Sequence, residues 1–292
     1  MLDAVLPYLH CPVCQGELAR TGSNGPVRCE RGHSFDVARQ GYLNLLRGHT
    51  PPGSADTAAM VEARARFLES GAFGPLEYHL ATELAARTAG LPEPRLVVDA
   101  GGGPGYYLAR ALDELPGAGG LAIDVSKHAA RRAARAHRRI GAVCADVWTG
   151  LPVRSGTASA VLNVFAPRNG AEFARVLRPG GVLFVVTPTA DHLADLVAAG
   201  LLLTVDDRKD ERVRAALGDQ FELAAVAGEM WDLDLRPDDV VTLAGMGPVA
   251  RHRPEAELRA RAAALPDPVT VQLSVEVSVY QPRVATLEGL VR

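Results

Sequence analysis

Four residues near the start of the chain have the types and spacing of a metal site. Cys11 and Cys14 form a Cys-x-x-Cys pair, and after fourteen intervening residues Cys29 is followed by His33. Zinc binds thiolate and imidazole ligands in a tetrahedron, and two close pairs supply four of them. The alternatives are free buried cysteines or a redox pair, which would open a helix after a strand. We predict a structural Cys₃His zinc site, because four protein ligands leave no open position.

A second pattern follows a buried apolar run and opens a helix. It reads DAGGGPG and contains Gly101, Gly103, Pro104 and Gly105. Glycines let the backbone turn sharply and pass close under a ligand. In doubly wound folds, this crevice after the first strand is where nucleotides bind. The pattern therefore predicts a nucleotide-like cofactor at this loop.

Three carboxylates at predicted strand ends make the cofactor more specific. Asp99 can meet the amino group of a methionine moiety, Asp124 can bind both ribose hydroxyls, and Asp146 lies where an adenine amino group would be. Together they indicate S-adenosylmethionine. The competing interpretation is a dehydrogenase, whose Gly-x-Gly-x-x-Gly loop holds a pyrophosphate. Pro104 and Gly105 do not fit that spacing and Asp99 would repel a pyrophosphate, so we favour a methyltransferase.

These residues must be positioned by strands that alternate with helices. Short apolar runs predict strands at 96–100, 120–124, 140–144, 159–164 and 182–187; a sixth strand is expected within 221–235, and an alternating pattern predicts a last strand at 269–280. Helices are expected at 57–70, 76–88, 127–139, 171–177 and 237–246. Such alternation implies an α/β, doubly wound sheet. We predict a class I, Rossmann-like methyltransferase fold with a seven-stranded, mostly parallel sheet and an N-terminal zinc-binding module.

A Pro- and Gly-containing stretch at 47–55 predicts a linker between two parts of the chain. We place a zinc-binding substrate-recognition module at 1–46 and an S-adenosylmethionine-dependent methyltransferase domain at 47–292, in which 47–90 are the linker and leading helices. Asp56 is the expected N-cap of the first helix.

Composition limits the remaining classes of function. The net charge is −3, so the chain does not have the strong excess of basic residues that many nucleic-acid-binding proteins carry. No apolar run reaches the roughly 18 residues that span a bilayer, and no signal peptide is recognisable, so we expect a cytoplasmic protein without membrane contact. One predicted helix carries arginines that either line RNA or, as we favour, form a solvated face: Arg131, Arg132, Arg135, Arg138 and Arg139.

The sequence also resembles a known family, the large-subunit (23S) rRNA (guanine-N1)-methyltransferases of the RlmA type, which include the tylosin-resistance methyltransferases. The shared motifs occur in one order: CPVC and CERGHSFDVARQGYLNLL (11–46), PPGSADTAAMVEARARFLESGAF (51–73), VVDAGGGPGYY (97–107), AIDVSK (122–127), NVFAPR (163–168) and TPTADHL (187–193). The string GHSFDVARQGYLNLL is the most specific of them. The resemblance therefore covers about the first two thirds of the chain.

The resemblance implies a set of ligands and a substrate. Zinc would be held by the four residues named above, and the cofactor would touch Phe73, Gly103, Pro104, Asp124 and His192. The zinc module would help to bind an rRNA hairpin, and the product would be N1-methylguanine, with tylosin-type macrolide resistance as a consequence. Many family members have an aromatic-rich stretch with a tryptophan where this chain reads MGPVARH (246–252), which leaves stacking there open.

Two candidate substrate-positioning residues follow the fourth strand, next to the methyl group in this fold. Asn163 can bind the guanine edge and Phe165 can stack on the base, although Phe165 fits core packing equally well. Arg168 can meet phosphate or O6, or be a solvated loop cation. A general base for the N1 proton is not identified: His192 and Asp191 are candidates, and each is more typical of a helix cap or the surface.

Three functions follow from these observations. The first is an rRNA methyltransferase, the second a natural-product small-molecule methyltransferase derived from this family, and the third a non-catalytic RNA-binding module. Intact Asp99, glycine loop and Asp124 argue against the third. Salt-dependent RNA binding would separate the first two. A homodimer is a further expectation that the residues do not test.

Overall fold

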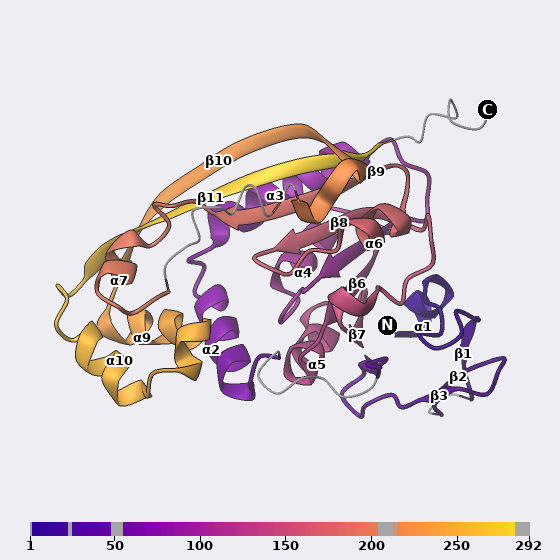
Figure 1. Cartoon of the computed structure of the whole chain (residues 1–292), viewed down its shortest axis with the longest axis horizontal. Helices are drawn as coiled ribbons and strands as arrows, with labels where there is room; N and C mark the ends of the chain where they lie inside the picture. Colours follow the sequence, from indigo (N-terminus) through magenta and orange to yellow (C-terminus); the bar gives the residue numbers. More distant parts are fainter. Residues whose placement is uncertain (1, 23–24, 48–54, 204–212, 214, 284–292) are drawn as a thin grey trace.

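The chain folds around one large sheet with helices on both faces and a small sheet at its N-terminal end (Figure 1). The computed structural model describes residues 2–22, 25–47, 55–203, 213 and 215–283. The small sheet contains β1 (Leu18–Arg20), β2 (Val27–Cys29) and β3 (Ser34–Phe35). The large sheet contains β4 (Leu43–Asn44), β5 (Leu96–Ala100), β6 (Gly119–Asp124), β7 (Ile140–Cys144), β8 (Ala158–Val164), β9 (Leu177–Pro188), β10 (Phe221–Leu235) and β11 (Val269–Pro282).

Helices connect most of these strands. The α-helices are α1 (Leu2–Val5), α2 (Ala58–Glu69), α3 (Gly74–Thr88), α4 (Tyr106–Asp113), α5 (Lys127–Ala136), α6 (Gly170–Val176), α7 (Ala194–Ala198), α9 (Pro237–Gly245) and α10 (Glu255–Ala262). Short 3₁₀ helices are η1 (Leu6–Tyr8), η2 (Val147–Thr149), η3 (Gly218–Gln220) and η4 (Pro248–Arg251). No helix in these described ranges is long and apolar enough to cross a membrane.

The strand order of the large sheet is β10-β11-β9-β8-β5-β6-β7-β4. Strands β4 to β9 pair in parallel, whereas β11 runs antiparallel to β9 and β10 antiparallel to β11. The predicted α/β class and doubly wound plan are confirmed. The predicted count of seven is wrong, because the described residues form eight strands in this sheet.

The additional strand is β4, at the sheet edge beside β7. Leu43 pairs with Val143 and Asn44 with Cys144, and the N–H of Leu45 donates to the Cys144 carbonyl at 2.9 Å. Two paired residues are too few to carry an alternating apolar pattern, so the sequence gives no signal for this strand.

Successive strand residues point to opposite faces of the sheet, which creates two apolar cores. Val97 of β5 lies in a core with α3, α4 and α9, whereas Val98 lies in a core with α6 and the N-terminal segment. The second core also contains Cys11 and Cys29. The small N-terminal sheet is therefore packed onto one face of the large sheet and shares its core.

The predicted helix at 57–70 forms as α2, but its cap differs from the expected one. Thr57 is the N-cap, and its hydroxyl accepts a hydrogen bond from the N–H of Met60 at 3.3 Å. The Asp56 carboxylate instead pairs with Arg64 and with Arg251. The prediction of Asp56 as the cap is therefore wrong. Most of the predicted linker, residues 48–54, lies outside the described residues.

Candidate metal and cofactor sites

The four predicted zinc ligands lie together in the small N-terminal sheet. The sulfurs of Cys11, Cys14 and Cys29 and a ring nitrogen of His33 all lie within 4.8 Å of one another. The Cys14 and Cys29 sulfurs are 3.6 Å apart, and His33 Nδ1 lies 3.6 Å from the Cys11 sulfur and 3.2 Å from the Cys29 sulfur. A tetrahedron with Zn–S bonds of about 2.3 Å puts its ligand atoms roughly 3.8 Å apart. The residues present fit a zinc ion.

Two tight turns hold these ligands in place. The N–H of Gln15 donates to the Cys11 carbonyl at 2.8 Å and closes the Cys-x-x-Cys turn. Gly32 has φ +82° between Cys29 and His33, and its N–H donates to the Cys29 carbonyl at 2.9 Å. Glycine adopts this left-handed conformation without steric cost. The second pair of ligands therefore depends on a glycine that the metal pattern itself does not include.

The glycine-rich loop lies at the carboxyl end of β5 and touches two neighbouring elements. Gly101 has φ +80°, and a Cβ atom there would lie 2.5 Å from the Ala166 Cβ in the loop after β8. Gly105 has φ +83°, and a Cβ atom there would lie 3.1 Å from the Ala133 Cα in α5. Larger residues would push the loop away from both neighbours.

Asp99 ends β5 beneath this loop and is almost completely buried, with 1% of its surface exposed. Its Oδ2 atom has no hydrogen-bond partner among the described residues. Burial, reinforced by the charge of Asp124, raises the pKa of Asp99 to about 7. A buried carboxyl oxygen without a donor is costly unless a ligand satisfies it. The amino group of S-adenosylmethionine is a donor of the required charge, so Asp99 fits that cofactor.

Asp124 ends β6, Asp146 lies two residues after the end of β7, and both already hold backbone groups. Asp124 accepts hydrogen bonds from the N–H groups of Gly103 at 2.9 Å and Ser126 at 2.7 Å, while burial raises its pKa. Asp146 accepts from the Trp148 N–H at 2.9 Å and begins η2. These bonds orient both carboxyl groups before any ligand binds.

A cavity of about 530 Å³ is lined by these loop ends. This volume is within the range of pockets for small ligands. Eight of the nine predicted cofactor residues line it: Phe73, Asp99, Gly101, Gly103, Pro104, Asp124, Asp146 and His192. Gly105 does not line the cavity, because it lies behind the loop against α5.

Aromatic rings form another part of the cavity wall. The Phe165 ring lies 6.0 Å from that of Phe73 and 6.0 Å from that of His192, between centroids. Phe73 is 2% exposed and also packs against Trp231 at 6.1 Å. Phe165 is 42% exposed and has φ +52°, an uncommon conformation for a bulky residue. The exposure of Phe165 toward the cavity is unlike ordinary core packing.

Asn163 and Arg168 lie differently from Phe165. Asn163 is fully buried at the end of β8, and its amide donates to the carbonyls of Ala100 at 3.1 Å and Pro167 at 2.8 Å. It does not line the cavity but joins the β5 end to the loop that carries Phe165. Arg168 is partly buried, and its burial lowers the pKa of the guanidinium. Arg168 is therefore not the fully solvated loop cation that the sequence offered as one of two alternatives.

Three features of the site have no clear signal in the sequence. Trp148 lies at the cavity with 65% of its surface exposed. Arg64 of α2 donates to the Met246 carbonyl at 2.8 Å, although the two residues are 182 positions apart. The stretch from Met246 to Val249 also lines the cavity. Only a fold that joins distant segments brings these groups to one place.

Two family descriptions match separate parts of the chain. Residues 9–49 match the family described as "RlmA, N-terminal". Residues 97–181 match the family described as "Methyltransferase domain". The first range includes all four candidate zinc ligands, and the second includes the glycine-rich loop and the carboxylates at the ends of β5, β6 and β7.

Three relatives are similar over much or nearly all of the chain. A Micromonospora griseorubida protein, named as a 23S rRNA (guanine-N(1)-)-methyltransferase, is 50% identical over 291 residues, 95% of this chain and 98% of the relative. The 23S rRNA (guanine(748)-N(1))-methyltransferase of Streptomyces fradiae is 49% identical over 282 residues, 97% of this chain and 99% of the relative. YxjB of Bacillus subtilis (strain 168), named as a 23S rRNA (guanine-N(1)-)-methyltransferase, is 35% identical over 191 residues, 64% of this chain and 66% of the relative.

Proposed function

The chain belongs to the 23S rRNA (guanine-N1)-methyltransferase family, and on that premise we propose that it transfers a methyl group from S-adenosylmethionine to N1 of a guanine in large-subunit rRNA. The observation that carries this proposal is the 49% identity to the Streptomyces fradiae enzyme over 97% of the chain. The cavity supports it, because it contains a buried Asp99 oxygen that has no partner in the described part of the chain and the exposed ring of Phe165.

We assign each carboxylate of the cavity to a different part of the cofactor. Asp99 would bind the amino group, Asp124 the ribose hydroxyls and Asp146 the adenine amino group. The glycine-rich loop, with Gly101, Gly103, Pro104 and Gly105, lets the backbone lie against the ligand. Phe73 and His192 would close the opposite wall. When bound, S-adenosylmethionine supplies an activated methyl group for in-line displacement, so the protein contributes chiefly orientation and proximity.

Phe165 and Asn163 would position the target guanine from the loop after β8. The exposed ring of Phe165 offers a face for stacking on a base taken out of its helix. Asn163 would act through this loop, because its amide donates both to the Pro167 carbonyl in the loop and to the Ala100 carbonyl at the end of β5. Phe165 is therefore the residue that we place against the base, and Asn163 is a positioning residue.

The remaining assignments follow from the same family. We place the zinc-binding recognition module at 1–46 and the methyltransferase domain, with its linker and leading helices, at 47–292. The zinc module would bind an rRNA hairpin in the cytoplasm, and methylation would confer tylosin-type macrolide resistance. A homodimer stays a prediction.

The test is transfer of a labelled methyl group from S-adenosylmethionine to an unmodified 23S rRNA fragment, mapped by primer extension. Methylation at N1 blocks base pairing, so we expect a new stop one residue before a single guanine. Fragments with that guanine replaced by adenine are the control and should stay unlabelled. If the protein binds the cofactor and leaves the rRNA unlabelled, the rRNA assignment is wrong and the small-molecule alternative replaces it.

A further inference from the structure

Trp148 is a large apolar side chain that the fold leaves in solvent. It is 65% exposed at the edge of the cofactor cavity and has no aromatic ring partner among the described residues. Tryptophan is usually well buried, and its exposure is common where another molecule binds. The exposure of Trp148 therefore indicates a site where another molecule binds.

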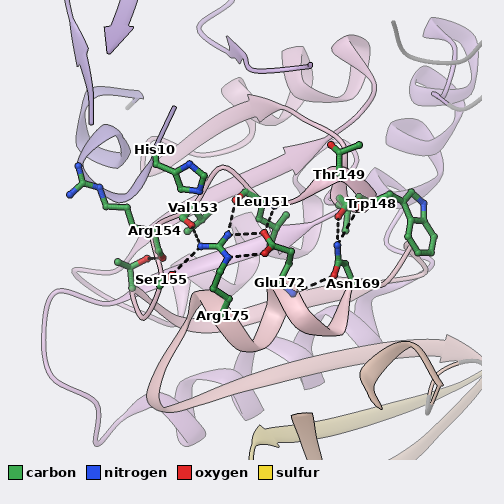
Figure 2. A network of polar contacts seen from close by, with 12 residues as sticks. His10, Trp148, Thr149, Leu151, Val153, Arg154, Ser155, Asn169, Glu172 and Arg175 are labelled. Carbon is green, nitrogen blue, oxygen red and sulfur yellow. Dashed lines mark hydrogen bonds and ion pairs between the residues drawn. The ribbon is translucent and has the colours of Figure 1, made fainter. Parts of the chain in front are cut away.

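The backbone under this indole is fixed by hydrogen bonds. The Trp148 N–H donates to the Asp146 carboxylate at 2.9 Å, and the Thr149 hydroxyl donates to the Asp146 carbonyl at 3.1 Å. From α6, the Asn169 amide donates to the carbonyls of Val147 at 3.0 Å and Trp148 at 3.4 Å. Figure 2 shows the Asn169 contacts beside Trp148 and Thr149. Because the backbone is fixed here, binding a partner at Trp148 costs little backbone conformational entropy.

The same loop leads from Trp148 to the zinc module. Glu172 and Arg175 of α6 pair at 2.7 Å, and the guanidinium of Arg175 donates to the carbonyls of Leu151 at 2.8 Å and Val153 at 2.6 Å (Figure 2). At the far end, the N–H of His10 donates to the Pro152 carbonyl at 3.1 Å. Residues 148–154 therefore form a braced connection between the cofactor cavity and the zinc module.

A second hollow, of about 650 Å³, lies along this connection. Its lining includes Thr149 and Arg154 from the loop and His10 and Gln15 from the zinc module. Trp148 lines the first cavity and its neighbour Thr149 the second, so an RNA strand bound along both would lie close to Trp148. Two cations of the hollow are already paired, Arg154 with Glu17 and Arg175 with Glu172, so neither is a free phosphate contact.

We propose that Trp148 stacks on an unpaired base of the rRNA next to the target guanine and so helps to select the substrate. This inference rests on the proposed function. Every base has a face for stacking, and aromatic side chains recognise single-stranded RNA in this way. The adenine of the cofactor is the other flat group nearby, but the cavity already offers it the buried side chain of Val147 and the neighbouring Val125.

The test compares Trp148→Ala, Trp148→Phe and a matched control, Tyr78→Ala, in the full-length protein. Tyr78 is an aromatic residue on α3 with 61% exposure that does not line the cofactor cavity. The affinity for a fluorescently labelled 23S rRNA hairpin is measured by anisotropy, and that for S-adenosylhomocysteine by calorimetry. For Trp148→Ala we expect a rise of about tenfold in the Kd for RNA, the order expected for a lost stack. Trp148→Phe should retain most of the affinity, and Tyr78→Ala all of it.

The other outcomes overturn the proposal in distinguishable ways. An unchanged Kd for RNA in Trp148→Ala rejects it. If Trp148→Ala has a higher Kd for S-adenosylhomocysteine and an unchanged Kd for RNA, the indole is assigned to the cofactor adenine. If the wild-type protein neither binds nor methylates the hairpin, the proposed function fails and this inference fails with it. Because the indole is exposed, thermal unfolding of Trp148→Ala should match that of the wild type, which separates lost recognition from lost folding.

Discussion

At the scale of single residues, Asp99 is placed for binding at the expense of stability. Its carboxyl group is buried, one oxygen has no partner among the described residues, and burial with the Asp124 charge raises its pKa to about 7. In the unfolded chain its pKa returns to the ordinary value of 3.8. The ionised form is therefore disfavoured by folding. In the ligand-free protein, the stability associated with this group is present below pH 3.8 and is lost as the pH rises through about 7.

We predict that Asp99→Asn raises the Kd for S-adenosylmethionine by about tenfold or more, because a charge-assisted hydrogen bond is lost. The same change should stabilise the ligand-free protein at pH 8, since each unit of raised pKa costs about 1.4 kcal/mol. This gain should shrink as the pH is lowered to 5. Calorimetric titration and denaturant unfolding at both pH values measure the two effects.

Asp219→Asn is the matched control for this prediction, because Asp219 is an exposed carboxylate on η3. It should leave both the affinity and the pH dependence unchanged. Wild-type cofactor affinity in Asp99→Asn would remove Asp99 from the binding site.

At the scale of elements, one arginine joins the ends of two helices. The sequence places Arg139 on a helix that runs to residue 139, but α5 ends at Ala136 and Arg139 turns inward. Its guanidinium donates to the carbonyl of Leu112 in the last turn of α4 and, just beyond that helix, to those of Leu115 at 2.6 Å and Ala118 at 2.8 Å. Carbonyls at a helix C-terminus lack partners within the helix, so Arg139 acts as a cap supplied from another element. The simple solvated-face interpretation is wrong for this residue.

We predict that Arg139→Ala lowers the free energy of unfolding by about 3 kcal/mol, since three partly buried carbonyls lose a charged donor. Denaturant unfolding followed by circular dichroism measures this change. The neighbouring Arg138 is exposed, and Arg138→Ala should change stability by less than about 0.5 kcal/mol. Equal losses in the two variants would contradict the capping role.

At the scale of the whole molecule, the zinc module and the methyltransferase fold share structure. Cys11 and Cys29 lie in the same core as Val98 and Val143, and β4 extends the large sheet. Leu9 also forms an isolated bridge with Val153, in the loop that carries Trp148. Because the metal site and the sheet share a core, metal binding that stabilises the zinc module should also stabilise the sheet.

We predict that the wild-type protein contains about one zinc ion per chain and that Cys14→Ser contains close to none, because a tetrahedral site loses one of four ligands. The variant should also unfold at a lower temperature and lose rRNA methylation. Elemental analysis, thermal unfolding and the methyl-transfer assay measure these outcomes. The control is Cys144→Ala, which removes the cysteine that lies outside the cluster in β7. A metal-free wild-type protein with full activity would contradict the zinc assignment.

The sequence by itself determined the features that rest on local patterns. The spacing of Cys11, Cys14, Cys29 and His33 fixed the ligand set, because chelation requires close pairs of donors. Apolar runs placed the parallel strands from β5 to β9 within about five residues, since buried parallel strands need continuous apolar side chains. The antiparallel strands β10 and β11 were also placed, the second by its alternating pattern. The order of strands and helices then indicated the fold class. The family motifs lie on these same segments.

Tertiary structure decided the features that depend on residues far apart in the chain. Strand β4 exists because Leu43 finds an edge one hundred positions away, and Thr57 caps α2 because Asp56 is drawn to Arg64 and Arg251. Asn163 is buried under its own loop, and Trp148 is left exposed between the cofactor cavity and the zinc module. The physical reason is common to all of these: local patterns govern backbone conformation and burial on average, whereas the partner of each polar or aromatic group is chosen by packing between distant elements.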